Sequence, residues 1–203
     1  MAAGLDSLVL GEPQVLGQVK EAFSIASEKQ CSGPFLNRLF HSAFAVGKRV
    51  RTETELGAGA VSVSFAAVQL ARKIFGSLKD RRVLVMGAGE MGKLTAKHLR
   101  SQGVGEIAIT SRTMGPVKQI AEAVDGTPVA WTELTKELAR ADIVVAATGS
   151  PNLTLTRKDI TSVMGPRRRG PLFIIDITIP RNVEPESGEL EQVFLYNLSL
   201  IHI

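Results

Sequence analysis

The sequence predicts an α/β fold with a doubly wound parallel sheet, preceded by a helical segment. From residue 83 onward, short apolar runs typical of strands buried on both faces alternate with amphipathic helical patterns. The first of these runs leads directly into a glycine-rich turn and a helix, as in nucleotide-binding βαβ units. Before residue 76 the periodicity is helical. Strict alternation of strand and helix is the pattern of a parallel sheet covered on both faces.

The glycine-rich turn follows a strand predicted at 83–86 and opens a helix that ends near Gly103. It reads Gly87-Ala88-Gly89-Glu90-Met91-Gly92. In such a turn the first glycine makes a tight bend, the second lets the backbone approach a pyrophosphate, and the third packs helix against strand. The free N–H groups of the helix then face the phosphates. The order strand, turn, helix predicts dinucleotide binding, with a glycine turn indifferent to phosphate as the alternative.

The remaining elements continue the alternation. Strands are predicted at 106–110, 127–130, 142–147, 172–177 and 193–196, and helices at 116–124, 132–139 and 156–164. Ligands of doubly wound sheets bind at the carboxyl ends of the strands. The candidate site therefore comprises the loops that begin at Gly87, Ser111, Thr148 and Thr178, all rich in Gly, Ser, Thr or Pro.

The end of the second strand predicts which dinucleotide binds. NAD-selective domains place Asp or Glu there to accept hydrogen bonds from the ribose 2′-OH. This chain instead has Ser111-Arg112-Thr113, with no carboxylate between Thr110 and Lys118. Two hydroxyls and a guanidinium suit a 2′-phosphate, so NADPH is the predicted cofactor; a solvated turn arginine is the alternative. The predicted cofactor-binding residues are Gly87, Ala88, Gly89, Glu90, Met91, Gly92, Ser111, Arg112, Thr113 and Thr148.

The N-terminal part is predicted to be helical. The first predicted helix has one apolar face, formed by Val15, Leu16, Val19, Ala22, Phe23 and Ala26. Ser32-Gly33-Pro34 breaks the chain. The apolar face of the second predicted helix, directed inward, is formed by Phe35, Leu36, Leu39, Phe40, Ala43 and Phe44. A turn at 57–62 precedes a third helix at 64–75, which stops at Gly76. The predicted domains are 1–78, an N-terminal helical part that ends in a connecting helix, 79–197, the NADP-binding Rossmann domain, and 198–203, a tail.

Composition excludes several classes of protein. The net charge of +4 is modest and its basic residues are scattered, which alone does not indicate nucleic-acid binding. No apolar run approaches the roughly 20 residues of a membrane helix, and no secretory signal opens the chain. The single cysteine, Cys31, fits a reducing compartment, so a cytoplasmic protein without a membrane partner is expected. Three histidines far apart and the absence of metal-binding motifs predict no metal site.

The segment from Gly4 to Lys20 resembles the signature segment of glutamyl-tRNA reductase, the enzyme that opens the five-carbon route to 5-aminolevulinate and tetrapyrroles. Five further segments resemble segments of the same family and follow one another in the same order: 48–54, 57–62, 87–92, 111–113 and 176–181. The resemblance spans Gly4 to about Asn197. It implies NADPH-dependent reduction of the glutamyl ester of tRNA to glutamate-1-semialdehyde, through a thioester on an enzyme cysteine.

The resemblance also assigns residues to the substrate. The positions that match substrate-contacting ones are Ser7, Glu12, Pro13, Gln14 and Gln18. From spacing alone, Gln14 and Gln18 on one helix face favour a solvated surface. The family's nucleophilic cysteine and an upstream histidine match positions before Met1, and Cys31 does not match the nucleophile's context. No catalytic residue is therefore assigned within this chain.

The resemblance leads us to interpret the chain as a fragment, in which 1–78 is the C-terminal part of the catalytic or substrate domain with its connecting helix and 198–203 is an atypical tail. Family members continue beyond the position of Asn197 into a helical dimerisation region, which implies a homodimeric parent. Because the family's N-terminal positions are expected to precede Met1, a plastid location stays open. The 203 residues are expected to bind NADPH without reducing glutamyl-tRNA. Two alternatives stay open: an NADP-binding module without catalysis, and another Rossmann dehydrogenase such as shikimate dehydrogenase. The match from Gly4 to Lys20 argues against the second.

Overall fold

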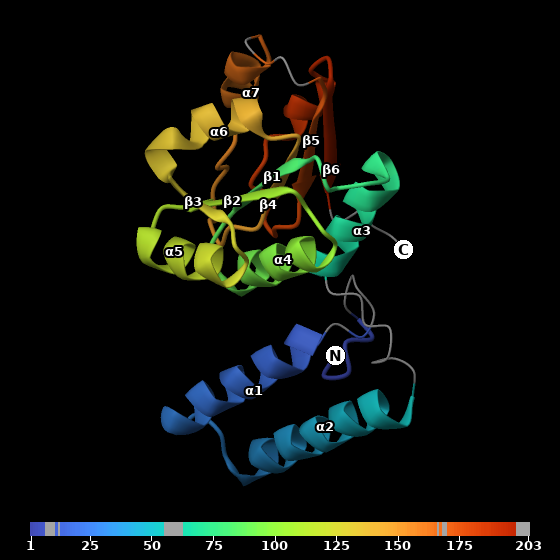
Figure 1. Ribbon diagram of the computed structural model, residues 1–203. Helices are drawn as coiled ribbons and strands as arrows, with labels where there is room; N and C mark the ends of the chain where they lie inside the picture. The colour runs from blue at the N-terminus through green and yellow to red at the C-terminus, as the bar shows by residue number, and fades with distance from the viewer. Residues whose placement is uncertain (7–10, 12, 55–62, 166, 168–169, 198–203) are drawn as a thin grey trace. The chain divides into compact units, whose positions relative to one another are not determined.

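The computed structural model describes residues 1–6, 11, 13–54, 63–165, 167 and 170–197 (Figure 1). The chain divides into two compact units, Met1–Val63 and Ser64–Ile203. Several predicted features lie outside the described residues: Ser7, Glu12, the turn at 57–62 and the tail at 198–203.

The second unit is built on a six-stranded sheet. Its strands pair in the order β3-β2-β1-β4-β5-β6, and every pair is parallel. They are β1 (Arg82–Met86), β2 (Glu106–Ser111), β3 (Thr127–Ala130), β4 (Ile143–Ala146), β5 (Leu172–Asp176) and β6 (Val193–Asn197). The chain runs outward from β1 to β3, crosses to β4 and runs outward again. The predicted doubly wound parallel sheet is confirmed, and its crevice lies where the order reverses, between β1 and β4.

Helices cover both faces of this sheet. They are α3 (Val63–Phe75), α4 (Glu90–Ser101), α5 (Met114–Ala123), α6 (Leu134–Arg140) and α7 (Arg157–Met164), with 3-10 turns η2 (Trp131–Glu133) and η3 (Pro185–Glu189). Figure 1 shows α4 and α5 on one face, and α6 and α7 on the other. Alternate strand residues face the two layers. Leu84 and Met86 join the buried cluster that includes Leu138 of α6 and Ile160 of α7.

A buried ion pair lies at the amino-terminal end of the central strand β1, the end opposite the crevice. Arg82 Nη2 lies 2.6 Å from Glu137 Oε2, with both side chains more than nine-tenths buried. The Arg82 N–H also donates to Asp142 Oδ2 at 2.9 Å. Burial lowers the pKa of Arg82, whereas pairing with Glu137 and Glu106 raises it, and the net shift is upward. These contacts tie β1 to α6 and to the start of β4.

Helix α3 packs with the second unit. Ser64 Oγ donates to the Met91 carbonyl of α4 at 3.2 Å, and the ring of Phe65 meets His98 edge-on at 5.6 Å. Desolvation in this contact lowers the pKa of His98. The packing of α3 therefore places the boundary between the two compact units before this helix, at Val63, whereas the sequence predicted the domain boundary after it, at residue 78. The functional assignment of 1–78 stays a prediction.

The first unit contains α1 (Pro13–Glu28) and α2 (Pro34–Glu53). They pack through aromatic rings: Phe23 stacks on Phe40 at 4.9 Å and meets Phe44 edge-on at 5.7 Å. The inward stripe predicted for α2 is wrong at its start, because Phe35 is 81% exposed and Leu39 is 54% exposed. Among the described residues α1 is the helix that packs against α2, and a single helix covers only part of a stripe that wide.

Candidate functional site

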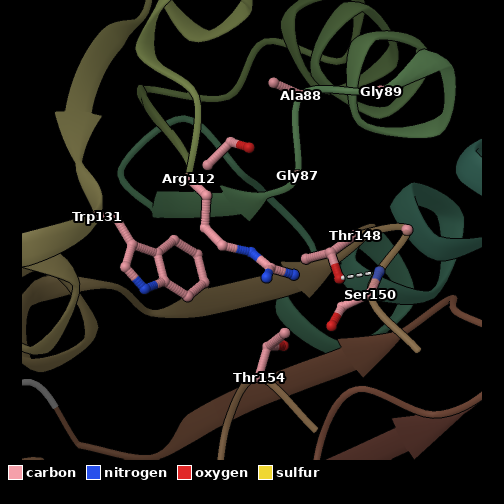
Figure 2. A pocket seen from close by; sticks show the side chains of 10 residues that line it. Gly87, Ala88, Gly89, Arg112, Trp131, Thr148, Ser150 and Thr154 are labelled. Carbon is pink, nitrogen blue, oxygen red and sulfur yellow. Dashed lines mark hydrogen bonds between the residues drawn. The ribbon is translucent and has the colours of Figure 1, made fainter. Parts of the chain in front are cut away.

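A cavity of about 140 Å³ opens at the carboxyl ends of the central strands (Figure 2). The loops after β1, β2, β3 and β4 supply its lining. The lining residues are Gly87, Ala88, Gly89, Ser111, Arg112, Trp131, Thr148, Gly149, Ser150 and Thr154. The cavity thus lies where the topology places the dinucleotide crevice.

The three glycines after β1 have three different surroundings. A Cβ on Gly87, which has φ +118°, would lie 2.2 Å from the Ala147 carbonyl oxygen. A Cβ on Gly92 would lie 2.0 Å from the Gly87 oxygen, inside the turn itself. A Cβ on Gly89 would meet nothing within 4 Å. Two glycines therefore allow close backbone packing, and the third leaves open the space that a pyrophosphate would fill.

Gly89 is also the N-cap of α4, so the first turn of this helix begins at the cavity. N–H groups in a first turn have no intrahelical acceptor and carry the positive end of the helix dipole. Glu90, in that turn, lies 3.9 Å from Lys93 and is exposed. The cradle left open by Gly89 and these donors fit the phosphates of a dinucleotide.

Two residues on neighbouring strand ends form one wall of the cavity. Ser111 of β2 pairs in register with Ala130 of β3, so Arg112 and Trp131 follow their strands at the same level. Figure 2 shows Arg112 pointing across the cavity toward Thr148 and Ser150, with Trp131 beside it. Arg112 is exposed, so its side chain can reorient toward an anion.

The opposite wall is the loop after β4, and Asn182 holds it in place. Asn182 is fully buried. Its Nδ2 donates to the carbonyls of Ser150 at 2.9 Å and Asn152 at 3.1 Å, and its Oδ1 accepts from the Thr148 hydroxyl. Its carbonyl accepts from the N–H of Thr154 at 2.8 Å. One side chain and its own backbone thereby fix the shape of this wall.

Asn182 is positioned in turn by the carboxylate of Asp176. Asp176 Oδ2 accepts from the N–H groups of Asn182 at 2.9 Å and Val183 at 3.0 Å, while Oδ1 accepts from Thr178. Asp176 is 1% exposed, and these four hydrogen bonds compensate the burial of its charge. The loop after β5 therefore supports the cavity from behind.

The structure brings together part of the predicted cofactor set. Six predicted residues line the cavity: Gly87, Ala88, Gly89, Ser111, Arg112 and Thr148. Glu90, Met91, Gly92 and Thr113 lie in adjoining elements without lining it. The loop at Thr178, also predicted as ligand-binding, does not line the cavity either.

The predicted cofactor set lacks four lining residues: Trp131, Gly149, Ser150 and Thr154. Gly149, Ser150 and Thr154 belong to the loop whose first residue, Thr148, is in the predicted set. Trp131 directly follows β3, and the same rule about strand ends would have found it.

The predicted substrate residues are in the first unit. Pro13 begins α1, Gln14 is half-buried and Gln18 is exposed. Among the described residues, Gln14 Oε1 is buried and has no hydrogen-bond partner. Cys31 is free and exposed. Within the described ranges no cluster of His, Cys, Asp or Glu could hold a metal ion, and no helix there is long and apolar enough to cross a membrane.

Two family models match the chain. Residues 1–54 match the model described as glutamyl-tRNA(Glu) reductase, N-terminal domain, and residues 69–202 match the model described as shikimate/quinate 5-dehydrogenase. The second match coincides with the sheet and its helices.

Curated relatives and solved structures extend the likeness to almost the whole chain. The glutamyl-tRNA reductases of Desulfotalea psychrophila and Geobacter metallireducens are each 48% identical over 98% of this chain, which covers 46% of theirs. The chain thus spans about half the length of the curated relatives it matches. The structure of glutamyl-tRNA reductase from Methanopyrus kandleri aligns with a TM-score of 0.65 at 40% identity, over 98% of this chain and 50% of that one.

Proposed function

The chain belongs to the glutamyl-tRNA reductase family, with residues 69–202 in the domain family described as shikimate/quinate 5-dehydrogenase, and we propose that it binds NADPH for the reduction of glutamyl-tRNA. The observation that carries the proposal is the cavity at the sheet's switch point, where an open glycine cradle at a helix N-terminus meets a cationic wall.

Each part of the cavity has a role toward the cofactor. The turn at Gly89 and the first N–H groups of α4 hold the pyrophosphate. Ser111 and Arg112 hold the 2′-phosphate, because a guanidinium forms a charge-assisted and bidentate contact with a phosphate. Thr148 and Ser150 lie on the β4 side, where the nicotinamide half extends in doubly wound domains. When bound, the reduced nicotinamide of NADPH would supply a hydride to the acyl carbon, and the leaving group would depart with the electron pair of its bond to that carbon and take up a proton, which gives an aldehyde and NADP⁺.

The substrate assignment rests on the relatives' names and on the first unit. We propose that the segment holding Ser7, Glu12, Pro13, Gln14 and Gln18 contacts the glutamyl group. The Oε1 of Gln14, which is buried and has no hydrogen-bond partner among the described residues, supports a polar ligand there. The assignment of residues 1–78 to the substrate domain and its connecting helix, a homodimeric parent and a cytoplasmic location are parts of the same proposal.

Two other functions are less well supported. A shikimate dehydrogenase would account for residues 69–202 alone, whereas identity to glutamyl-tRNA reductases extends over 98% of the chain. A binding module without catalysis would share every feature of the cavity.

The reaction is tested on the protein that the complete gene encodes. Mixed with NADPH and glutamyl-tRNA, it is expected to oxidise NADPH in step with aldehyde formation, the aldehyde being trapped by a hydrazine. Shikimate with NADP⁺ should give no reduced cofactor. Oxidation of shikimate would assign the chain to the dehydrogenases instead, and cofactor binding without either reaction would favour the binding module.

Cofactor choice is tested by equilibrium titration at fixed salt. NADPH is expected to bind at least about tenfold more tightly than NADH, and Arg112→Ala should remove most of that difference, because a hydrogen bond to a charged group contributes roughly 1.5–3 kcal/mol. Lys118→Ala is the control: it removes one exposed positive charge from α5 without touching the cavity lining. Equal dissociation constants for the two cofactors in the unsubstituted protein would contradict the assignment of the 2′-phosphate to Arg112.

A further inference from the structure

We propose that Trp131 binds the adenine ring of the dinucleotide by stacking its indole face against it, an inference that rests on the proposed function. Trp131 is the aromatic member of the cavity lining and the single tryptophan of the chain. The sequence gives no motif for this role, because Trp131 follows a strand with no glycine-rich turn or charge signature.

The position of Trp131 indicates which part of the cofactor it meets. Arg112 follows β2, where doubly wound domains bind the ribose of the adenosine half. Ser111 and Ala130 are in register, so Trp131 stands at the same level one strand farther out, about 4.8 Å away across the sheet. It therefore lies on the side of Arg112 away from β4 and the nicotinamide half. Adenine, attached to the ribose, is the group that reaches this side.

The surroundings of the indole suit a flat ring. The other lining side chains are hydroxyls, one guanidinium and the methyl of Ala88, with glycines between them. Trp131 thus contributes the large apolar surface of an otherwise polar cavity. A planar aromatic ligand would cover this surface and gain a stacking interaction, whereas a phosphate or a sugar would leave the indole face exposed to water.

The indole is also held before any ligand arrives. Trp131 is half-buried, and it packs against the hydrophobic cluster that contains Val129 of β3 and Leu138 of α6. It begins the 3-10 turn η2, which continues directly into α6. Figure 2 shows the ring beside the Arg112 side chain at the cavity wall. A ring fixed in this way loses little conformational freedom on binding.

The proposal is tested with ligands that carry or lack adenine. Trp131→Ala is expected to raise the dissociation constants of NADPH, NADH and adenosine 2′,5′-bisphosphate alike, by about tenfold, the scale of one base stacked on an aromatic ring. Trp131→Phe should keep most of the affinity. Reduced nicotinamide mononucleotide, which lacks adenine, should bind all three proteins equally. Unchanged binding of adenosine 2′,5′-bisphosphate by a folded Trp131→Ala protein would overturn the proposal.

A second measurement uses the unsubstituted protein, so it holds even if Trp131→Ala fails to fold. Because Trp131 is the only tryptophan, its emission should change as adenosine 2′,5′-bisphosphate saturates the site and stay constant with oxidised nicotinamide mononucleotide. Saturable NADPH binding with no change of emission on adding the bisphosphate would contradict the role of Trp131 alone. Absence of any dinucleotide binding would contradict the proposed function.

Discussion

Replacing Gly87 with alanine is expected to lower the free energy of unfolding of the second unit by about 3 kcal/mol or more, the combined cost of overpacking and a strained φ. The new Cβ would lie 2.2 Å from the Ala147 oxygen and 2.9 Å from the Thr148 nitrogen, and φ at this position is +118°. Both neighbours are backbone atoms at the end of β4, which pairs with β1. Relief of the clash would have to separate the two central strands.

Gly89→Ala is the matched comparison, because it adds the same methyl two residues along the same turn. Its φ is −83°, and the Cβ would meet nothing within 4 Å. Stability should change by no more than about 0.5 kcal/mol, while the dissociation constant of NADPH rises at least about tenfold, because the methyl occupies the space of the pyrophosphate. Urea denaturation and NADPH titration of both variants measure the two effects. A Gly87→Ala protein as stable as the parent would show that the turn can shift away from β4.

The contrast between these glycines shows why part of the site could be predicted. The roles of Gly87, Gly89 and Gly92 depend on a strand, a turn and a helix that are consecutive in the chain, so the spacing alone conveys them. The parallel, doubly wound sheet could be predicted as well, since apolar runs alternate with helical patterns, and the runs that form β1, β4 and β5 are short and buried along their whole length. The resemblance between 4 and 20 added the family, which the comparisons confirm.

What could not be predicted depends on contacts between distant segments. The rule about strand ends places Trp131 at the correct end of the sheet, but its place beside Arg112 depends on the register in which β3 pairs with β2. Asn182 lies 32 residues after Ser150, in a loop that does not itself line the cavity. The exposed Phe35 has the opposite cause: an amphipathic period indicates that one face is apolar, but it does not say how much of that face a neighbour covers.

Asn182→Ala is expected to cost about 2–4 kcal/mol of stability and to weaken NADPH binding as well. The change removes a side chain that donates to Ser150 and Asn152 and accepts from Thr148. Each buried polar group left without a partner costs about 1–3 kcal/mol, although water can compensate those nearest the cavity. Two of the three partners, Thr148 and Ser150, line the cavity, so the loss of order appears where the cofactor binds. Reduced affinity is therefore expected although Asn182 itself lies behind the wall.

Asn152→Ala separates this effect from the loss of any asparagine in the loop. Asn152 is exposed, and it takes part in the network through its backbone N–H and carbonyl, which the substitution keeps. The free energy of unfolding of the Asn152→Ala protein should stay within about 0.5 kcal/mol of that of the parent protein, and its dissociation constant for NADPH should be unchanged. Asn182→Ala should instead lower the urea midpoint and raise that constant together, because the same hydrogen bonds determine both. Loss of stability with unchanged NADPH affinity would mean that the loop after β4 keeps its shape without the Asn182 side chain.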